Sequence, residues 1–346
     1  MRAPRPLAAA LFPLLALAAA PLRAQPPARP VPDASPLLFV SNERSHDISV
    51  IDAGTLRVVA TIAVGARPRG IQAAPDGRRV YVALSDERPN AEGGSDAIAV
   101  IDVATRKIVA RYRAGSDPEQ FAVTPDGHRL YASNEDAGLA TAIDPRSGKV
   151  MAELTVGIEP EGVAVSPDGR WAYVTAETSN TVSVIDTRTD RVAANLLVDV
   201  RPRATAFSPS GARAYVTAEI GGTVSVIDAR RHALLGAISL GDDDPKPVGI
   251  AVAPDGRRLY VALGRLDAVA VVDPAARRVL ARIPVGRRPW GVALSPDGRR
   301  LFTADGNANT VSVVDTATRR VVATVKVGSG PWGVAVVSRS AARPPG

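Results

Sequence analysis

Residues 160–198 read PEGVAVSPDGRWAYVTAETSNTVSVIDTRTDRVAANLLV, and this stretch decides the fold. It contains four short segments rich in Val, Ile, Thr and Tyr, with partial alternation and turn residues between them. We predict strands at Gly162–Ser166, Trp171–Thr175, Thr181–Asp186 and Arg191–Val198. The Pro-Asp-Gly segment favours a turn because Pro fixes φ, Asp bonds locally and Gly adopts a positive φ.

The same unit recurs seven times along the chain. Its Val-Ile-Asp segment, or a close variant, ends at Asp52, Asp102, Asp144, Asp186, Asp228, Asp273 and Asp315. Four of the six spacings between these residues are 42, and the other two are 50 and 45. An Asp in every unit suits an Asx-type turn, so we assign it a structural role rather than a catalytic one. Seven units of four strands predict an all-β fold, a seven-bladed β-propeller of four-stranded antiparallel blades.

The two ends of the repeat region are complementary. Leu37–Val40 has the pattern of a second strand, whereas Pro331–Val337 has the pattern of a first strand. We therefore expect the N-terminal strands (37–64) to join the C-terminal strand (331–337) in one blade, which closes the ring without a free edge. Aromatic residues are only 4% of the chain, and seven of them occupy one equivalent position per blade: Phe39, Tyr81, Tyr131, Tyr173, Tyr215, Tyr260 and Phe302. We expect thin, tightly stacked sheets rather than one large core.

The N-terminus has the features of a secretory signal. Arg2 and Arg5 precede an apolar run at 7–20, which is too short for a comfortable membrane span. Residues 22–24 form an acceptable cleavage site, although an uncleaved anchor with a Pro-rich tether is the alternative. We predict a signal peptide (1–24), a Pro-rich segment (25–36), the propeller (37–337) and a disordered C-terminal tail (338–346). The protein would then be periplasmic or secreted, and we expect a monomer with no membrane span after cleavage.

Composition excludes several kinds of chemistry. The chain has no Cys, so it can form no disulfide, thiolate metal site or Cys nucleophile. Its His residues, His46, His128 and His232, fall in different loops, so a His triad or His-ligated metal is not expected. The net charge of +7 falls to 7 − 3 = +4 without the arginines of residues 1–24, which is weak evidence for nucleic acid.

One face of the predicted propeller varies between repeats. Pro-Asp-Gly and Asp turns share one face, which we call the constant face, and the other loops share the variable face. Two loops are longer than their equivalents in the other repeats, at 86–95 and 241–245, and both fall on the variable face. Loops that vary on a rigid scaffold are the usual place for binding.

Two sets of side chains should surround the channel mouth on the variable face. The residue after the Pro that opens each first strand differs between blades: Arg69, Glu119, Glu161, Arg203, Val248, Trp290 and Trp332. A second set follows the second strand: Glu43, Glu135, Glu177 and Glu219. One interpretation is a ring of inter-blade ion pairs, such as Arg69–Glu119 and Glu161–Arg203. The other is a ligand site formed by all of these residues except Val248, with the two Trp residues as a stacking wall.

The repeats resemble the YVTN family of β-propeller repeats over essentially all of 37–337. The residues that carry this resemblance are Tyr173–Glu177, Thr181–Asp186 and the repeated Pro-Asp-Gly-Arg-Arg. The opening Phe39–Ser45 looks like the secreted propellers associated with PQQ-dependent alcohol catabolism, and the layout is similar to periplasmic YncE-like proteins. The first resemblance implies a partner or pathway rather than a bound cofactor, and the second implies a link to single-stranded DNA. Seven-bladed lactonases share the architecture, which alone implies no activity.

Our leading functional hypothesis is a non-enzymatic binding or scaffold propeller. Its partner would be a periplasmic quinoprotein dehydrogenase, a cytochrome or a transporter component, bound at the channel mouth. The first alternative is a lactonase-like hydrolase or lyase that uses the Glu cluster, with or without a divalent cation. Glu135, Glu161 and Glu177 are the cation candidates, because carboxylate oxygens suit a hard cation. The second alternative is single-stranded nucleic-acid binding, which the Glu cluster opposes.

Overall fold

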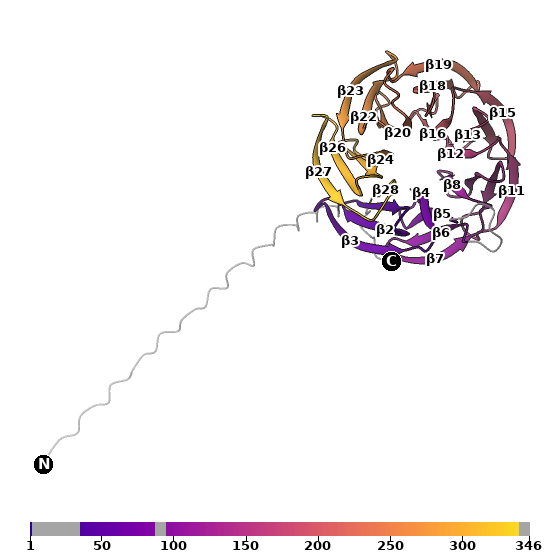
Figure 1. Cartoon of the computed structure of the whole chain (residues 1–346). Helices are drawn as coiled ribbons and strands as arrows, with labels where there is room; N and C mark the ends of the chain where they lie inside the picture. The colour runs from indigo at the N-terminus through magenta and orange to yellow at the C-terminus, as the bar shows by residue number, and fades with distance from the viewer. Residues whose placement is uncertain (2–34, 87–94, 339–346) are drawn as a thin grey trace. The chain divides into compact units, whose positions relative to one another are not determined.

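The computed structural model describes Met1, residues 35–86 and residues 95–338. The predicted signal peptide, most of the Pro-rich segment and all but the first residue of the predicted tail lie outside the described residues. Every strand belongs to the second of two compact units, Asp33–Gly346. Its 28 strands form seven four-stranded antiparallel sheets arranged around a central axis, as Figure 1 shows. The predicted all-β, seven-bladed propeller is therefore confirmed.

Each blade begins at the axis and ends at the rim. The axial strands are β4 (Arg67–Ala73), β8 (Pro118–Val123), β12 (Pro160–Val165), β16 (Pro202–Phe207), β20 (Pro247–Val252), β24 (Pro289–Leu294) and β28 (Pro331–Val337). The second strands are β1 (Leu37–Asn42), β5 (Arg79–Ser85), β9 (Leu130–Asn134), β13 (Trp171–Ala176), β17 (Arg213–Ala218), β21 (Leu259–Leu263) and β25 (Arg300–Asp305). The third strands are β2 (Asp47–Asp52), β6 (Ala97–Asp102), β10 (Leu139–Ile143), β14 (Thr181–Asp186), β18 (Thr223–Asp228), β22 (Ala268–Asp273) and β26 (Thr310–Asp315). The rim strands are β3 (Arg57–Ala63), β7 (Lys107–Tyr112), β11 (Val150–Thr155), β15 (Arg191–Leu197), β19 (Ala233–Ser239), β23 (Arg278–Pro284) and β27 (Arg320–Lys326).

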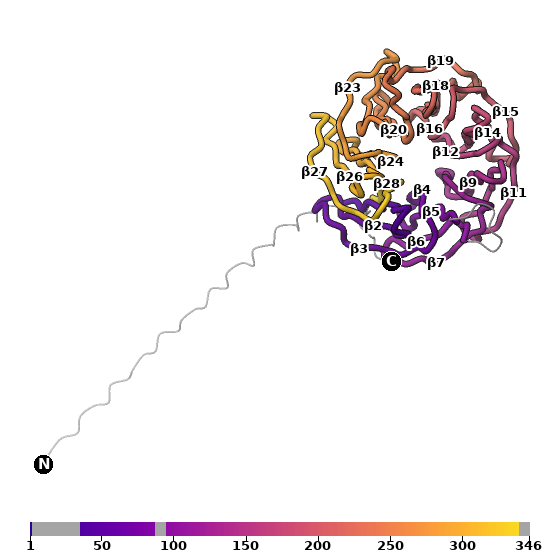
Figure 2. Tube along the Cα trace, in the orientation of Figure 1, coloured from indigo at the N-terminus to yellow at the C-terminus, as the bar shows by residue number. Residues whose placement is uncertain are grey.

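The two ends of the repeat region close the ring as the sequence predicts. β28 pairs antiparallel with β1, and the sheet order is β28-β1-β2-β3. The last strand, yellow in Figure 2, therefore lies beside the indigo first strands. We number this closing blade 1, and blades 2 to 7 begin with β4, β8, β12, β16, β20 and β24. Among the described residues there is no helix long and apolar enough to cross a membrane.

The core is divided into clusters between neighbouring blades. Phe39 of blade 1, for example, shares a cluster with Val80 and Val82 of blade 2. All seven aromatic residues of the equivalent position are buried, from 0% exposed at Phe39 to 5% at Tyr215. Each of the seven clusters contains one aromatic residue of this position, and the cluster of Tyr81 also contains Tyr112 and Phe121. The low aromatic content therefore fits a core that is divided between the blades.

The constant face is built by the predicted turns. Gly169 of the blade 4 Pro-Asp-Gly turn has a φ of 72°, and Asp168 accepts a 3.1 Å hydrogen bond from the Arg170 N–H. In the Asp turns, the Asp102 carboxylate accepts from the Thr105 N–H at 2.7 Å, and this bond lowers the pKa of Asp102. These aspartates satisfy backbone donors, which confirms that their role is structural.

A β-bulge interrupts the axial strand of blades 2 to 7. In blade 4, Pro160 pairs with Ala176 and Val163 with Val174, so Glu161 and Gly162 together face Thr175. The Thr175 hydroxyl accepts from the Gly162 N–H (2.7 Å) and donates to the Arg203 carbonyl of blade 5 (2.8 Å). We call this pair of bonds the hydroxyl clasp, and it joins the blade 4 bulge to blade 5. Equivalent clasps are made by Ser41, Ser133 and Thr217.

The clasp predicts a stability effect at Thr175. Replacing Thr175 with Val keeps the shape but leaves the buried Gly162 N–H and the Arg203 carbonyl without their partner. We expect the free energy of unfolding to fall by about 1–3 kcal/mol, measured by urea denaturation. Thr175→Ser keeps the hydroxyl and is the control, which should lose less than half as much. Equal losses for the two variants would contradict the clasp.

Candidate functional site at the channel mouth

The bulges place the predicted ligand residues at the channel mouth. Each bulge removes its first residue from the ladder, and bulges commonly redirect side chains next to active sites. The residue before the strand-opening Pro has a positive φ between 46° and 59° in blades 3 to 7, and Gly330 of blade 1 has a φ of 67°. Arg201 shows how this conformation is held, since its N–H donates to Asn180 Oδ1 (2.8 Å) and its carbonyl accepts from the Glu219 N–H (2.8 Å). The second set of glutamates is thereby fixed beside the first.

Arg203 is the centre of one ion-pair cluster. Its guanidinium lies 3.0 Å from Glu161 Oε1 and 3.8 Å from Glu219 Oε2, and it also pairs with Glu177. Arg201 Nε donates to Glu177 at 2.6 Å. The side chains of Arg203 and Glu177 are 11% and 3% exposed, so this pair is shielded from water, whereas Arg201 is 44% exposed.

Arg69 is the centre of a second cluster on the other side of the mouth. It pairs with Glu119, and it lies 3.1 Å from Glu43 Oε1 and 3.7 Å from Glu135 Oε2. Both predicted inter-blade pairs, Arg69–Glu119 and Glu161–Arg203, are therefore present. The two interpretations of the ring do not exclude each other, because Glu161 and Arg203 also line a cavity.

The two tryptophans form an aromatic wall opposite Glu161 and Arg203. The rings of Trp290 and Trp332 are stacked, with centroids 6.3 Å apart and an interplanar angle of 15°. The guanidinium groups of Arg288 and Arg203 lie 4.5 Å and 5.5 Å from the Trp290 ring centroid. Cation–π contacts of this kind hold the Trp290 ring in place beside Trp332.

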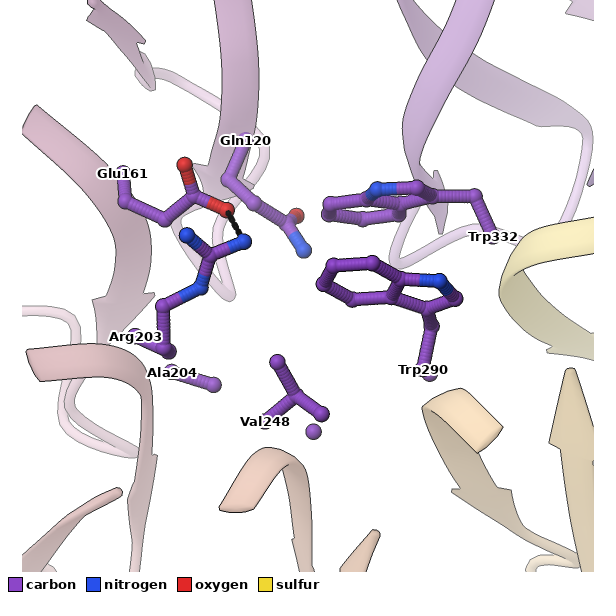
Figure 3. A pocket seen from close by; sticks show the side chains of 9 residues that line it. Gln120, Glu161, Arg203, Ala204, Val248, Trp290 and Trp332 are labelled. Atoms are coloured by element: carbon purple, nitrogen blue, oxygen red, sulfur yellow. Dashed lines mark ion pairs between the residues drawn. The ribbon is translucent and has the colours of Figure 1, made fainter. Parts of the chain in front are cut away.

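A cavity of about 40 Å³ lies between the ion pair and the wall, as Figure 3 shows. Its lining residues are Gln120, Glu161, Arg203, Ala204, Val248, Gly249, Trp290, Gly291 and Trp332. A second cavity of about 160 Å³ shares Gln120, Ala204 and Trp332 and continues along the axial strands. We call the first the mouth cavity and the second the axial cavity.

The structure separates the ten predicted ligand residues into groups. Glu161, Arg203, Trp290 and Trp332 line the mouth cavity. Glu177 and Glu219 pair with Arg203 but do not line the mouth cavity. The second cluster consists of Arg69, Glu119, Glu43 and Glu135. Gln120 lines both cavities and was missed by the sequence analysis. The sequence does distinguish Gln120, because its side chain is long whereas the equivalent residue in the other blades is Gly or Ala.

Burial perturbs two carboxyl groups of the site. Loss of solvent raises the pKa of Glu161, and the nearby Arg203 and Arg69 oppose this rise. Burial likewise raises the pKa of Glu135, opposed mainly by Arg69. A carboxylate with a raised pKa is a stronger proton acceptor than an ordinary one, so it suits general-base chemistry near neutral pH.

The carboxylates that could share a cation differ from those predicted. The oxygens of Asp117, Glu119 and Glu135 lie within 4.8 Å of one another. Of the predicted set Glu135, Glu161 and Glu177, the last two instead pair with Arg203. Arg69 already neutralises Glu119, so a cation here would compete with a guanidinium. A divalent cation at the mouth stays a prediction.

The largest cavity described, about 500 Å³, lies on the constant face between blades 1 and 7. It is lined by Ser35, Pro36, Ala53, Gly54, Ser295, Pro296, Asp297, Arg299, Arg300, Phe302 and Val336. Arg300 donates to the Ala53 carbonyl at 2.8 Å, and Ser295 to Asp297 at 2.5 Å. These groups hold turns in place, and they do not form the opposed ion pair and aromatic wall of the mouth cavity.

Two family models match the chain, each over less than half of it. The model described as "Choice-of-anchor I domain" matches residues 41–200, and "Lactonase, 7-bladed beta-propeller" matches residues 195–337. No curated protein sequence matches the chain significantly. The resemblance to a seven-bladed propeller is thus supported at the level of the fold, whereas the YVTN and YncE-like assignment stays a prediction.

Solved structures with this fold include lactonases. A protein assigned as a 6-phosphogluconolactonase from Bacteroides fragilis is 18% identical, with a TM-score of 0.74 over 89% of this chain and 100% of that one. The periplasmic gluconolactonase PpgL of Pseudomonas aeruginosa is 21% identical, with a TM-score of 0.70 over 88% of this chain and 99% of that one. Hydrazine synthase of Kuenenia stuttgartiensis is 23% identical, with a TM-score of 0.72 over 85% and 99%. At these identities the structures establish a shared fold.

These findings correct the leading functional hypothesis. A scaffold accessory to PQQ-dependent alcohol oxidation is not supported, whereas the Lactonase match includes Arg203, Trp290 and Trp332 of the mouth cavity. The lactonase-like alternative is the better interpretation.

The buried cluster around Arg203 predicts a pH-dependent loss of stability. Arg203→Met leaves the carboxylates of Glu161, Glu177 and Glu219 without their central cation, which should lower the free energy of unfolding by about 3–5 kcal/mol at pH 7. Burial raises the pKa of Glu161 and Arg203 opposes this rise, so in the variant the Glu161 pKa should lie further above its unfolded value and the native state should bind more protons than the unfolded state. Its stability should therefore fall as pH rises from about 5 to 8, and the deficit should be smaller at the acid end.

Urea denaturation across this pH range tests the Arg203 prediction. Arg320→Met is the matched control, because Arg320 is exposed on the rim strand β27. The control should change the free energy of unfolding by less than about 0.5 kcal/mol at every pH. A deficit for Arg203→Met that is small, or that is independent of pH, would contradict the assigned ion pairs.

Proposed function

We propose that the protein hydrolyses small lactones at the mouth cavity. The observation that carries this proposal is the buried Glu161–Arg203 pair, 3.0 Å apart, facing the stacked Trp290 and Trp332 across one cavity. The Lactonase match over 195–337 supports the same class of reaction.

The residues fit the steps of ester hydrolysis. A lactone ring would lie against the tryptophan wall, and the Glu161 carboxylate would accept a proton from the water that attacks the carbonyl carbon. The negative charge that develops on the carbonyl oxygen would be stabilised by the Arg203 guanidinium, which is held in place before the reaction. Collapse of the tetrahedral intermediate breaks the ring C–O bond, and the alkoxide takes back a proton to give the hydroxy acid.

The charge balance of the mouth favours an uncharged substrate. Arg69, Arg201 and Arg203 each pair with at least two glutamates, and Lys246 lies 3.0 Å from Asp244. These carboxylates would repel a phosphate dianion approaching the arginines. We therefore infer a neutral sugar lactone rather than a phosphorylated one.

We also propose a periplasmic location for this activity. The charged start, short apolar run and cleavage site of residues 1–24 support it, and so does the similarity in fold to a periplasmic gluconolactonase. Detection of the protein in an osmotic-shock fraction tests this location.

The proposal predicts a pH limb that depends on Glu161. Glu161 must be ionised to act as a base, and burial raises its pKa, so kcat/KM for D-glucono-1,5-lactone should rise with pH through a value above the ordinary 4.5. Glu161→Gln should lower kcat/KM by roughly 10²–10⁴-fold and remove the limb. The measurement is the rate of acid release above the spontaneous rate, and 6-phosphogluconolactone should react more slowly than the unphosphorylated lactone.

A matched control separates the proposed base from a general effect of lost charge. Glu153 is exposed on the rim strand β11, far along the blade from the axial strand. Glu153→Gln should retain the wild-type rate and pH limb. Wild-type activity that survives Glu161→Gln would remove the assigned base, and no turnover of either lactone by the wild type would overturn the function itself.

A further inference from the structure

Gln120 is an exception at the most crowded position of the propeller. The second residue of each bulge, or its equivalent in blade 1, is small in the other blades: Gly70, Gly162, Ala204, Gly249, Gly291 and Gly333. A Cβ on Gly291 would lie 2.7 Å from the Trp332 carbonyl oxygen, and one on Gly70 would lie 2.8 Å from the Glu119 carbonyl oxygen. Close approach of neighbouring axial strands therefore selects glycine, yet blade 3 has a long polar side chain there.

The backbone of Gln120 is fixed, and its side chain points into the site. The Ser133 hydroxyl lies 3.1 Å from both the N–H and the carbonyl oxygen of Gln120, as part of the blade 3 clasp. The side chain extends toward the space between the Glu161–Arg203 pair and Trp332, as Figure 3 shows. Gln120 lines both the mouth cavity and the axial cavity, so it stands where the two meet.

The carboxamide of Gln120 has unused hydrogen-bonding capacity. Across residues 35–86 and 95–338, no side-chain hydrogen bond is made by this carboxamide. Gln72 in the neighbouring blade shows the contrast, because its Oε1 accepts from the Val123 N–H at 3.1 Å and so serves the fold. The free donors and acceptor of the Gln120 carboxamide face a cavity whose charged groups are already paired. A neutral group that both donates and accepts suits the hydroxyl groups of a sugar ring.

We propose that Gln120 is the specificity-determining residue of the mouth cavity. Its carboxamide hydrogen-bonds ring hydroxyls of a lactone that lies against Trp332, and its length closes the mouth cavity toward the axial cavity. Gly70 makes room for this side chain, since a Cβ there would lie 2.8 Å from Gln120 Oε1. This assignment rests on the proposed lactonase function and names the feature of the substrate that is recognised.

The test measures the turnover of hydroxylated and of unsubstituted lactones by the full-length chain. Gln120→Ala should lower kcat/KM for D-glucono-1,5-lactone by roughly tenfold, the effect of losing one or two uncharged hydrogen bonds. Its kcat/KM for δ-valerolactone, which has no ring hydroxyl, should change less than about twofold. Gln72→Ala is the matched control, and it should alter stability but leave the ratio of the two kcat/KM values unchanged. An unchanged ratio in Gln120→Ala would overturn the assignment.

Binding of D-gluconolactam, a lactam that cannot be hydrolysed as a lactone, separates the two proposals. Binding by the wild type that weakens about tenfold in Gln120→Ala supports the role of Gln120, even if the wild type turns over no lactone and the hydrolase proposal fails. Equal binding by the two proteins overturns the role of Gln120, even if hydrolysis is observed. No binding and no turnover by the wild type overturns both.

Discussion

The close approach of neighbouring axial strands is the constraint on which this structure depends. Seven strands converge on one axis, so the backbone of each meets the carbonyl groups of the next. Glycine at Gly70, Gly162, Gly249 and Gly291 is the consequence, because a Cβ there would meet a neighbouring main chain. The hydroxyl clasps satisfy the groups that the bulges leave unpaired, and they join one blade to the next. The hydrophobic core is then divided into seven clusters between blades rather than gathered into one large core.

The same constraint creates the candidate site. The bulge in each of blades 2 to 7 places one side chain at the mouth, and these side chains differ in charge and size between blades. Arg203 has both a structural and a proposed chemical role, because it pairs with three buried glutamates and also lines the mouth cavity. A site in which ion pairs are already satisfied is prearranged, so substrate binding need not order its charged groups.

The sequence was sufficient for the fold and for part of the site. Repeat spacing predicted the blades, the ring closure and the four strands of blade 4, whose bounds differ from the observed β12–β15 by at most two residues. Comparing one position across repeats found Glu161, Arg203, Trp290 and Trp332. Gln120 was not predicted, because sequence alone does not show that the second residue of a bulge also faces the channel. Which glutamates share Arg203 depends on side-chain packing, so the predicted cation set was not found together.

The most direct test of the account is a crystal structure of the protein with D-gluconolactam. The account predicts that the lactam ring lies against Trp332 in the mouth cavity, with its carbonyl oxygen toward Arg203 and a ring hydroxyl within hydrogen-bond distance of the Gln120 carboxamide. Electron density for the lactam only in the cavity between blades 1 and 7, with the mouth cavity holding solvent, would contradict it.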